Sequence, residues 1–196
     1  MNIRIKRAML AAGIAMALPL SGQASDGTIT FTGAVTASTC TLSVNGGSNA
    51  GTATVALPTV DIGALSSTGA GTTAAGTFFS VGVSNCTAVA DIGSTPTAPT
   101  QVSIYFEAGP NVDEVTGGLI NTVSGSNVEV NLYNASGSTI VGTPIKPGTN
   151  THQPAPLTIA AGGTQWFYAG YSTAGAGIAA TAGAVSTSIT YSLVYQ

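Results

Sequence analysis

Hydrophobic and polar residues alternate along two segments near the ends of this chain. In the segment Thr28–Thr36, apolar residues and one glycine occupy every second position: Ile29, Phe31, Gly33 and Val35. In the segment Ser186–Tyr195, the corresponding series is Ile189, Tyr191, Leu193 and Tyr195. Alternation with a period of two is typical of a strand with one buried face. The second strand reaches the last residue of the chain, and we expect it to need a neighbour that the same domain does not supply. The two patterns therefore predict copies that pair head to tail.

Six further segments have the composition of strands, because they are rich in Val, Ile, Thr, Tyr and Phe and are separated by turn-forming residues. They are Thr39–Val44, Ala53–Leu57, Thr77–Val83, Val102–Glu107, Val128–Tyr133 and Gln165–Ser172. No segment has a convincing period of 3.6, and Ala64–Gly76 is interpreted as a loop that could hold a short helical turn. This number of short strands favours an all-β, immunoglobulin-like sandwich over a barrel.

The first 24 residues have the features of a secretory signal peptide. Arg4, Lys6 and Arg7 form a basic start, an apolar run covers Ala8–Leu20, and small residues precede a cleavage point after Ala24. A retained membrane anchor is the alternative, but the apolar run is short for a permanent span. We expect export out of the cytoplasm, which leaves a mature chain of 172 residues (196 less 24), enough for one domain with a real core.

Removal of the leader changes the charge balance of the chain. Lys146 becomes the only basic residue of the mature chain against seven acidic residues, a formal charge of −6. Such a surface cannot neutralise phosphates, so nucleic acid and anionic membranes are implausible partners.

The two cysteines, Cys40 and Cys86, predict one disulfide, because the count is even and the leader directs the chain to an oxidising compartment. Two free buried thiols are the alternative. The bridge would close a loop of about 46 residues, which stabilises a fold by roughly 4 kcal/mol in the chain-entropy model. A metal site on these cysteines lacks further ligands, since His152 is the only histidine.

The sequence offers no catalytic constellation, and we predict neither an enzyme nor a bound metal or cofactor. A single histidine and one mature lysine leave only carboxylates to act as base or nucleophile. A glycosidase pair made from Glu107 and Glu114 is an unfavoured alternative. The adjacent residues Asp113 and Glu114 are typical of a solvated turn, and a calcium site there would need more oxygen ligands.

Several segments resemble those of one family when they are taken in their order and spacing. They are Gly27–Val35 followed by Cys40, the partner Cys86, Tyr105–Pro110, Thr116–Asn121, Gly183 and the terminal Tyr191–Gln196. The chain resembles pilins of the chaperone–usher pathway, and in particular type 1-like fimbrial major subunits. The resemblance covers essentially the whole mature chain.

The resemblance implies an incomplete immunoglobulin-like sandwich that lacks its last strand, residues 39–196, preceded by an N-terminal donor-strand extension, residues 25–38. In such pilins a periplasmic chaperone first fills the gap, and at an outer-membrane usher the extension of the next identical subunit replaces it. The donor residues would be Ile29, Phe31, Gly33 and Val35. The acceptor groove, which also binds the chaperone, would include Gly183, Ile189, Tyr191, Leu193 and Tyr195.

The function that follows is that of a structural subunit of a surface fimbria, which polymerises by donor-strand exchange and supports adhesion and biofilm formation. It would travel through the periplasm to the cell surface. A minor adaptor or tip-associated adhesive subunit of the same fimbria is the alternative, because the sequence does not give the number of copies. A two-domain tip adhesin fits less well, since this chain is one domain long and has a donor segment.

Overall fold

The computed structural model describes residues 39–47, 51–65, 73–87, 99–175 and 178–196. The predicted signal peptide and the donor-strand extension, with Ile29, Phe31, Gly33 and Val35, lie outside the described residues. All elements below belong to one compact unit.

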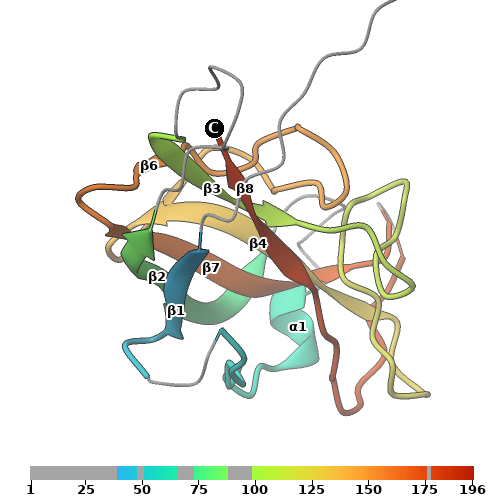
Figure 1. Cartoon of the computed structure of the whole chain (residues 1–196). Helices are drawn as coiled ribbons and strands as arrows, with labels where there is room; N and C mark the ends of the chain where they lie inside the picture. Colours follow the sequence, from blue (N-terminus) through green and yellow to red (C-terminus); the bar gives the residue numbers. More distant parts are fainter. Residues whose placement is uncertain (1–38, 48–50, 66–72, 88–98, 176–177) are drawn as a thin grey trace, which may run out of the picture. The chain divides into compact units, whose positions relative to one another are not determined.

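Five antiparallel strands form the larger sheet (Figure 1), in the order β1-β2-β7-β4-β5. They are β1 (Thr39–Val44), β2 (Ala74–Thr87), β7 (Gly163–Thr173), β4 (Val128–Ser136) and β5 (Thr139–Val141). The predicted strands at Thr39–Val44, Thr77–Val83, Val128–Tyr133 and Gln165–Ser172 are confirmed, and the last three extend further than the sequence indicated. Strands β4 and β5 form a hairpin with a Gly137-Ser138 turn, in which Ser136 pairs with Thr139 and Gly137 has a φ of 59°.

Three antiparallel strands form the smaller sheet, in the order β6-β3-β8. They are β6 (Leu157–Thr158), β3 (Gln101–Phe106) and β8 (Tyr191–Tyr195). The predicted strand Ser186–Tyr195 is confirmed only over its second half. A four-residue helix, α1 (Ile62–Leu65), overlaps the start of the segment Ala64–Gly76 that was interpreted as a loop.

The predicted strand Ala53–Leu57 is wrong, because none of these residues belongs to a strand. The segment packs its apolar side chains, Val55 and Leu57, against the core while the carbonyl of Ala56 accepts a hydrogen bond from the hydroxyl of Thr77. The alternation of apolar residues thus reflects packing against the core, and the segment does not pair with a neighbouring strand.

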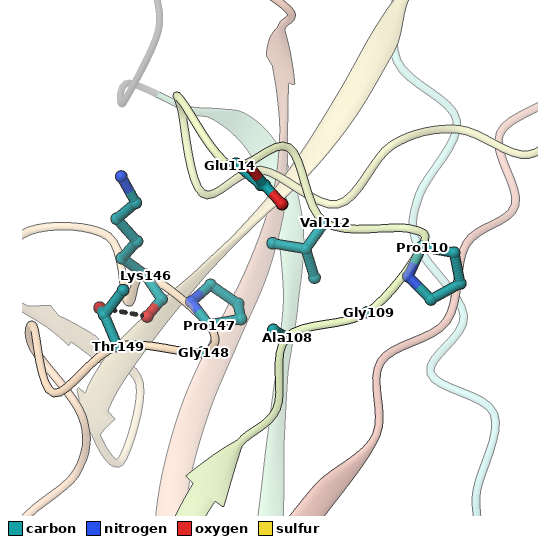
Figure 2. A pocket seen from close by; sticks show the side chains of 9 residues that line it. All are labelled: Ala108, Gly109, Pro110, Val112, Glu114, Lys146, Pro147, Gly148 and Thr149. Atoms are coloured by element: carbon teal, nitrogen blue, oxygen red, sulfur yellow. Dashed lines mark hydrogen bonds between the residues drawn. The ribbon is translucent and has the colours of Figure 1, made fainter.

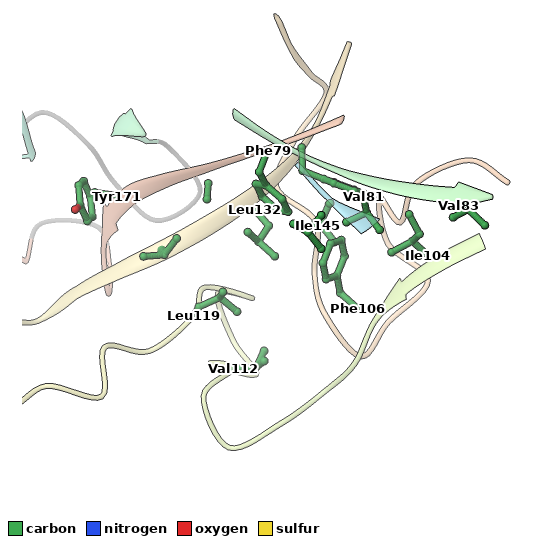
Figure 3. Packing of buried hydrophobic residues seen from close by; sticks show 14 of the residues in the cluster. Phe79, Val81, Val83, Ile104, Phe106, Val112, Leu119, Leu132, Ile145 and Tyr171 are labelled. Atoms are coloured by element: carbon green, nitrogen blue, oxygen red, sulfur yellow. The ribbon is translucent and has the colours of Figure 1, made fainter. Parts of the chain in front are cut away.

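The core lies between the two sheets. Figure 3 shows Phe79 and Val81 from the larger sheet close to Ile104 and Phe106 from the smaller one. The ring of Phe167 on β7 joins them, at centroid distances of 5.3 Å from Phe79 and 5.1 Å from Phe106. Each fully buried side chain of this size contributes about 1.5–3 kcal/mol. The two sheets are therefore held together as a sandwich.

The predicted disulfide between Cys40 and Cys86 is present and joins β1 to β2 at the edge of the larger sheet. No helix in the described part of the chain is both long and apolar enough to cross a membrane.

Candidate functional site

Strand β8 lies at one edge of the smaller sheet, and among the described residues no strand pairs with its outer side. On its inner side it pairs with β3, so that Val102, Ile104 and Phe106 stand opposite Tyr195, Leu193 and Tyr191. Figure 1 shows β8, in dark red, crossing in front of the sheet beside β3. An unpaired edge presents a row of backbone donors and acceptors to which another strand can be added.

The hydrogen bonds between β3 and β8 show which residues of β8 direct their backbone groups at the open edge. Gln101 and Gln196 exchange both backbone hydrogen bonds, at 2.9 and 2.8 Å, and Glu107 N–H donates to the carbonyl of Thr190 at 2.9 Å. Hydrogen-bonded and non-bonded pairs alternate along an antiparallel ladder. Ser192 and Val194 therefore direct their N–H and C=O groups at β3. The corresponding groups of three other residues point away from β3, toward the open side: Tyr191, Leu193 and Tyr195.

Burial changes abruptly between the two paired strands. On β3, Val102, Ile104 and Phe106 are each only 1% exposed. Their cross-strand partners on β8 also pack against the core, but all three remain only half-buried. The same half-buried alternation continues before β8 through Val185, Thr187 and Ile189. The described residues thus cover one flank of the hydrophobic core only in part, along residues 185–195, and we call this stripe the open flank.

The segment that precedes β8 is held by loops rather than by a ladder. The backbone and the hydroxyl of Thr122 both donate to the carbonyl of Ser186 at 2.8 Å. The side chain of Asn111 donates to the hydroxyl of Ser188 at 3.0 Å. These contacts keep residues 186–190 extended in line with β8, although they are not part of the strand.

Tyr191 reaches from β8 toward the other sheet. Its hydroxyl donates to the carbonyl of Gly51, which follows β1, at 2.7 Å. Its ring lies 6.3 Å from the ring of Phe106. Desolvation by the surrounding side chains raises the pKa of this hydroxyl, which therefore stays protonated and able to donate.

Two recesses lie where β3 ends. The smaller, of about 130 Å³, is lined by Glu107–Val112 and Ser188–Thr190 and adjoins the open flank at Ile189. The larger, of about 650 Å³, is lined by residues 108–110, 112, 114 and 146–149. Figure 2 shows that its walls are mostly backbone, proline and Val112, with Glu114 and Lys146 as the charged side chains. This lining holds no nucleophile with an adjacent base.

A carboxyl pair lies on the outer face of the larger sheet. Glu129 on β4 is 4% exposed and accepts a hydrogen bond from the hydroxyl of Thr116 at 3.1 Å. Desolvation, together with the nearby carboxylate of Asp113, raises the pKa of Glu129. Backbone N–H groups of Thr116 and Val115, at 3.0 and 2.7 Å, lower the pKa of Asp113. Through these hydrogen bonds, the carboxyl groups of Glu129 and Asp113 hold the loop of residues 113–118 in place.

The two carboxylates of the alternative glycosidase pair have different surroundings. Glu107 accepts a hydrogen bond from the hydroxyl of Ser192 and so links β3 to β8. Glu114 is exposed at the rim of the larger recess. Among the described residues no group of three or more His, Cys, Asp or Glu side chains could hold a metal ion.

Comparison with known proteins decides the family. Residues 57–196 match the model of the type-1 fimbrial protein family, FimA. The chain belongs to the type-1 fimbrial protein family. It is 34% identical over 189 residues to the major fimbrial subunit SMF-1 of Stenotrophomonas maltophilia (strain K279a), covering 92% of this chain and 98% of that protein. It is also 34% identical over 180 residues to the F17 fimbrial protein of Escherichia coli, covering 88% and 89% of the two chains.

Among solved structures, a chaperone–usher pilus superposes with a TM-score of 0.51 at 19% identity, covering 91% of this chain and all of that one. This likeness confirms the fold, since the prediction of an all-β, immunoglobulin-like domain agrees with a pilin architecture. The family and the curated relatives are structural fimbrial proteins and not enzymes, and this chain is a fimbrial subunit of that family.

The structure brings together most of the acceptor residues named from the sequence. Tyr191, Leu193 and Tyr195 share the inner face of β8, and Ile189 continues their row. Gly183 lies apart, exposed in the segment before β8, where an added Cβ would stand 3.2 Å from the Cβ of Ser126.

Sequence reasoning missed two residues of the open flank and one residue that accepts a hydrogen bond from it. Val185 and Thr187 extend the alternating series, and their spacing of two from Ile189 is a signal that could have identified them. Gly51 is joined to the site only by the fold, 140 positions away from Tyr191 in sequence, and no local pattern indicates it.

Proposed function

We propose that this chain is the shaft subunit of a fimbria and that it polymerises by strand addition along the open flank. Residues 25–38 of one copy pair with β8 of the next and place Ile29, Phe31 and Val35 over the uncovered core. The observation that carries this function is the combination on β8 of outward backbone groups with half-buried inward side chains. Among the described residues, this edge has no hydrogen-bonded neighbour on its outer side and only a partial hydrophobic cover. One alternating strand supplies both.

The energies favour a stable link between subunits. Burial of three apolar donor side chains, at about 1.5–3 kcal/mol each, gives several kcal/mol. Backbone pairing along β8 removes an edge that otherwise acts as a template for aggregation.

Before assembly the same flank needs a temporary cover. A periplasmic chaperone fills it with one of its own strands, and an outer-membrane usher exchanges that strand for the extension of the next subunit. The predicted leader directs the chain into this route, which ends at the cell surface. There the filament supports adhesion and biofilm formation.

A donor-fused chain tests the acceptor assignment. It carries a second copy of residues 25–38 after Gln196 and should be a stable, folded monomer without a chaperone. A matched control replaces Ile29, Phe31 and Val35 of the added copy with serine and should aggregate. Equal folding of the two fused chains would show that β8 does not accept the segment.

Electron microscopy tests the place of the subunit in the filament. Cells that lack this protein should lose all filaments of this type. Loss of only the structures at the filament tip would assign the chain to a minor adaptor instead.

A further inference from the structure

The loop of residues 113–118 presents an apolar side chain to solvent at its tip. Val115 is 86% exposed, the largest exposed fraction among the large hydrophobic residues of the described chain. The backbone N–H groups of Val115 and Thr116 donate to Oδ1 of Asp113 at 2.7 and 3.0 Å. The N–H of Gly117 donates to the carbonyl of Asp113 at 2.8 Å. The exposed valine therefore projects from a loop that its own hydrogen bonds hold in shape.

The larger recess lies directly beside this projection, because Glu114, the neighbour of Val115, is part of its lining. Its two walls hold each other in place. The N–H of Gly148 on one wall donates to the carbonyl of Phe106 at 2.8 Å, and a Cβ added at Gly148 would lie 2.5 Å from the Cβ of Ala108 on the other wall. With a volume of about 650 Å³, the recess has room for a side chain of the size of valine. One surface thus carries a projection and a hollow side by side.

Two opposite charges mark the rim of the recess. Lys146 is the only lysine or arginine after Arg7 in the sequence, and Glu114 is an exposed carboxylate. Figure 2 shows them on different segments of the rim. The Lys146 ammonium donates a long hydrogen bond, of 3.4 Å, to the carbonyl of Val115 and so lies next to the tip of the loop. A second molecule with the same surface offers a carboxylate to this ammonium and an ammonium to this carboxylate.

A surface with these features can pair with a copy of itself. In a contact with two-fold symmetry both partners use the same patch. Val115 of each copy then enters the recess of the other copy, and Glu114 of each copy meets Lys146 of the other. Subunits that repeat head to tail within one filament make contacts between unlike patches, so a two-fold contact cannot join them. The contact therefore belongs between separate filaments.

We propose that Val115, Glu114, Lys146 and the larger recess join neighbouring filaments side by side, through a two-fold contact between identical chains. This inference goes beyond the proposed function, because it concerns contacts between filaments and not the link between subunits of one filament. A single contact of this kind is weak, since exposed ion pairs contribute little on their own. A filament repeats the contact along its length, and multivalency makes the sum strong. Filaments therefore bundle, whereas single subunits stay apart.

Exchange of charge between filaments tests this contact. Sheared filaments of the parent, of Lys146→Glu and of Glu114→Lys are compared by electron microscopy and low-speed sedimentation. Parent filaments should bundle, whereas each variant sets like charges opposite one another and should bundle at least about tenfold less. A mixture of the two variants brings opposite charges back together at both pairs and should bundle as the parent does. Both variants keep a net negative charge, so a general attraction between them does not explain this recovery.

A matched pair of substitutions tests the projection itself. Val115→Ser and Val141→Ser each replace an exposed valine, and Val141 on β5 is 49% exposed and does not line the recess. Val115→Ser should lower the sedimented fraction about tenfold, because the side chain no longer fills the recess of the other copy. Val141→Ser should change it by less than about twofold. Equal effects of the two substitutions would overturn the role of Val115.

The remaining results of the mixing experiment overturn the proposal. Bundling of either charge variant alone, or its absence from the parent or from the mixture, would show that filaments do not meet through Glu114 and Lys146. Failure of the two variants to form filaments would place this surface inside the filament, which also contradicts a contact between filaments. Strand addition is tested separately by the donor-fused chain, so the two proposals fail independently.

Discussion

Ile104 and Leu193 stand directly opposite one another on β3 and β8, yet Ile104 is 1% exposed and Leu193 is only half-buried. Both side chains point into the same core. The difference arises because β3 has neighbours on both sides, whereas among the described residues β8 has one. Among the described residues, the cover of the core is therefore less complete at β8 than at β3.

Leu193→Ser and Val194→Ser form a matched pair of substitutions on β8. Leu193 faces the core, whereas Val194 is 40% exposed on the other face. Loss of about 2 kcal/mol of apolar burial should weaken strand pairing by a factor of roughly 30. Leu193→Ser should therefore lower both the chaperone-bound subunit and the surface filament, as measured by immunoblotting of periplasmic and sheared fractions. Val194→Ser should change the amounts of chaperone-bound subunit and of surface filament by no more than about twofold. Equal effects of the two substitutions would contradict the assignment of Leu193 to the core-facing side of β8.

Gly118→Ala should destabilise the subunit, because the added Cβ would press on the carboxylate of Glu129 and lie 3.1 Å from Oδ1 of Asn131. Overpacking of this kind costs about 1–3 kcal/mol. Gly109→Ala is the control, since nothing lies within 4 Å of its added Cβ. The measurement is the thermal unfolding temperature of each variant, made in the donor-fused chain. The interpretation of the loop as anchored on Glu129 fails if Gly118→Ala unfolds at the temperature of the parent.

The carboxyl pair predicts how stability depends on pH. Burial raises the pKa of Glu129 above its usual 4.5, so the folded state binds its proton more tightly than the unfolded state does. Stability from this group is therefore present below pH 4.5 and is lost as pH rises through the folded pKa. Asp113 has a pKa lowered from 3.8, so its contribution to stability is fully present above pH 3.8 and is lost as pH falls through the folded pKa.

Glu129→Gln should remove the decline in stability on the alkaline side of pH 4.5. The melting temperature of the donor-fused chain, followed from pH 4 to pH 8, is the measurement. Glu114→Gln changes an exposed carboxylate and is the control. A decline that persists unchanged in Glu129→Gln would assign the pH dependence to other groups.

Cys40→Ser and Cys86→Ser should cause the same loss of subunit, and the double substitution should be no worse than either. Each removes the one bridge, which is worth roughly 4 kcal/mol for a loop of this length. Subunit level in the periplasm is the readout. Unequal single variants would mean that one cysteine has a role outside the bridge.

Much of the fold follows from the sequence because the long strands alternate cleanly or form continuous apolar runs. Strand β5 was missed although the Gly137-Ser138 pair is a hairpin signal, because the strand has only three residues and all are exposed. Ala53–Leu57 was assigned wrongly, since alternation reports a buried face and not a hydrogen-bonded neighbour. The inner face of β8 was predictable from local spacing, whereas the contact between Tyr191 and Gly51 depends on how two sheets stack.

Amide hydrogen exchange along β8 in the assembled filament tests the central claim most directly. The amides of Ser192 and Val194 face β3 and should exchange slowly whether or not a donor strand is present. The amides of Leu193 and Tyr195 face the open edge, and they are protected only if another strand pairs there. Strand addition predicts that all four exchange at similarly slow rates in the filament. Fast exchange of Leu193 and Tyr195 beside slow exchange of Ser192 and Val194 would contradict it.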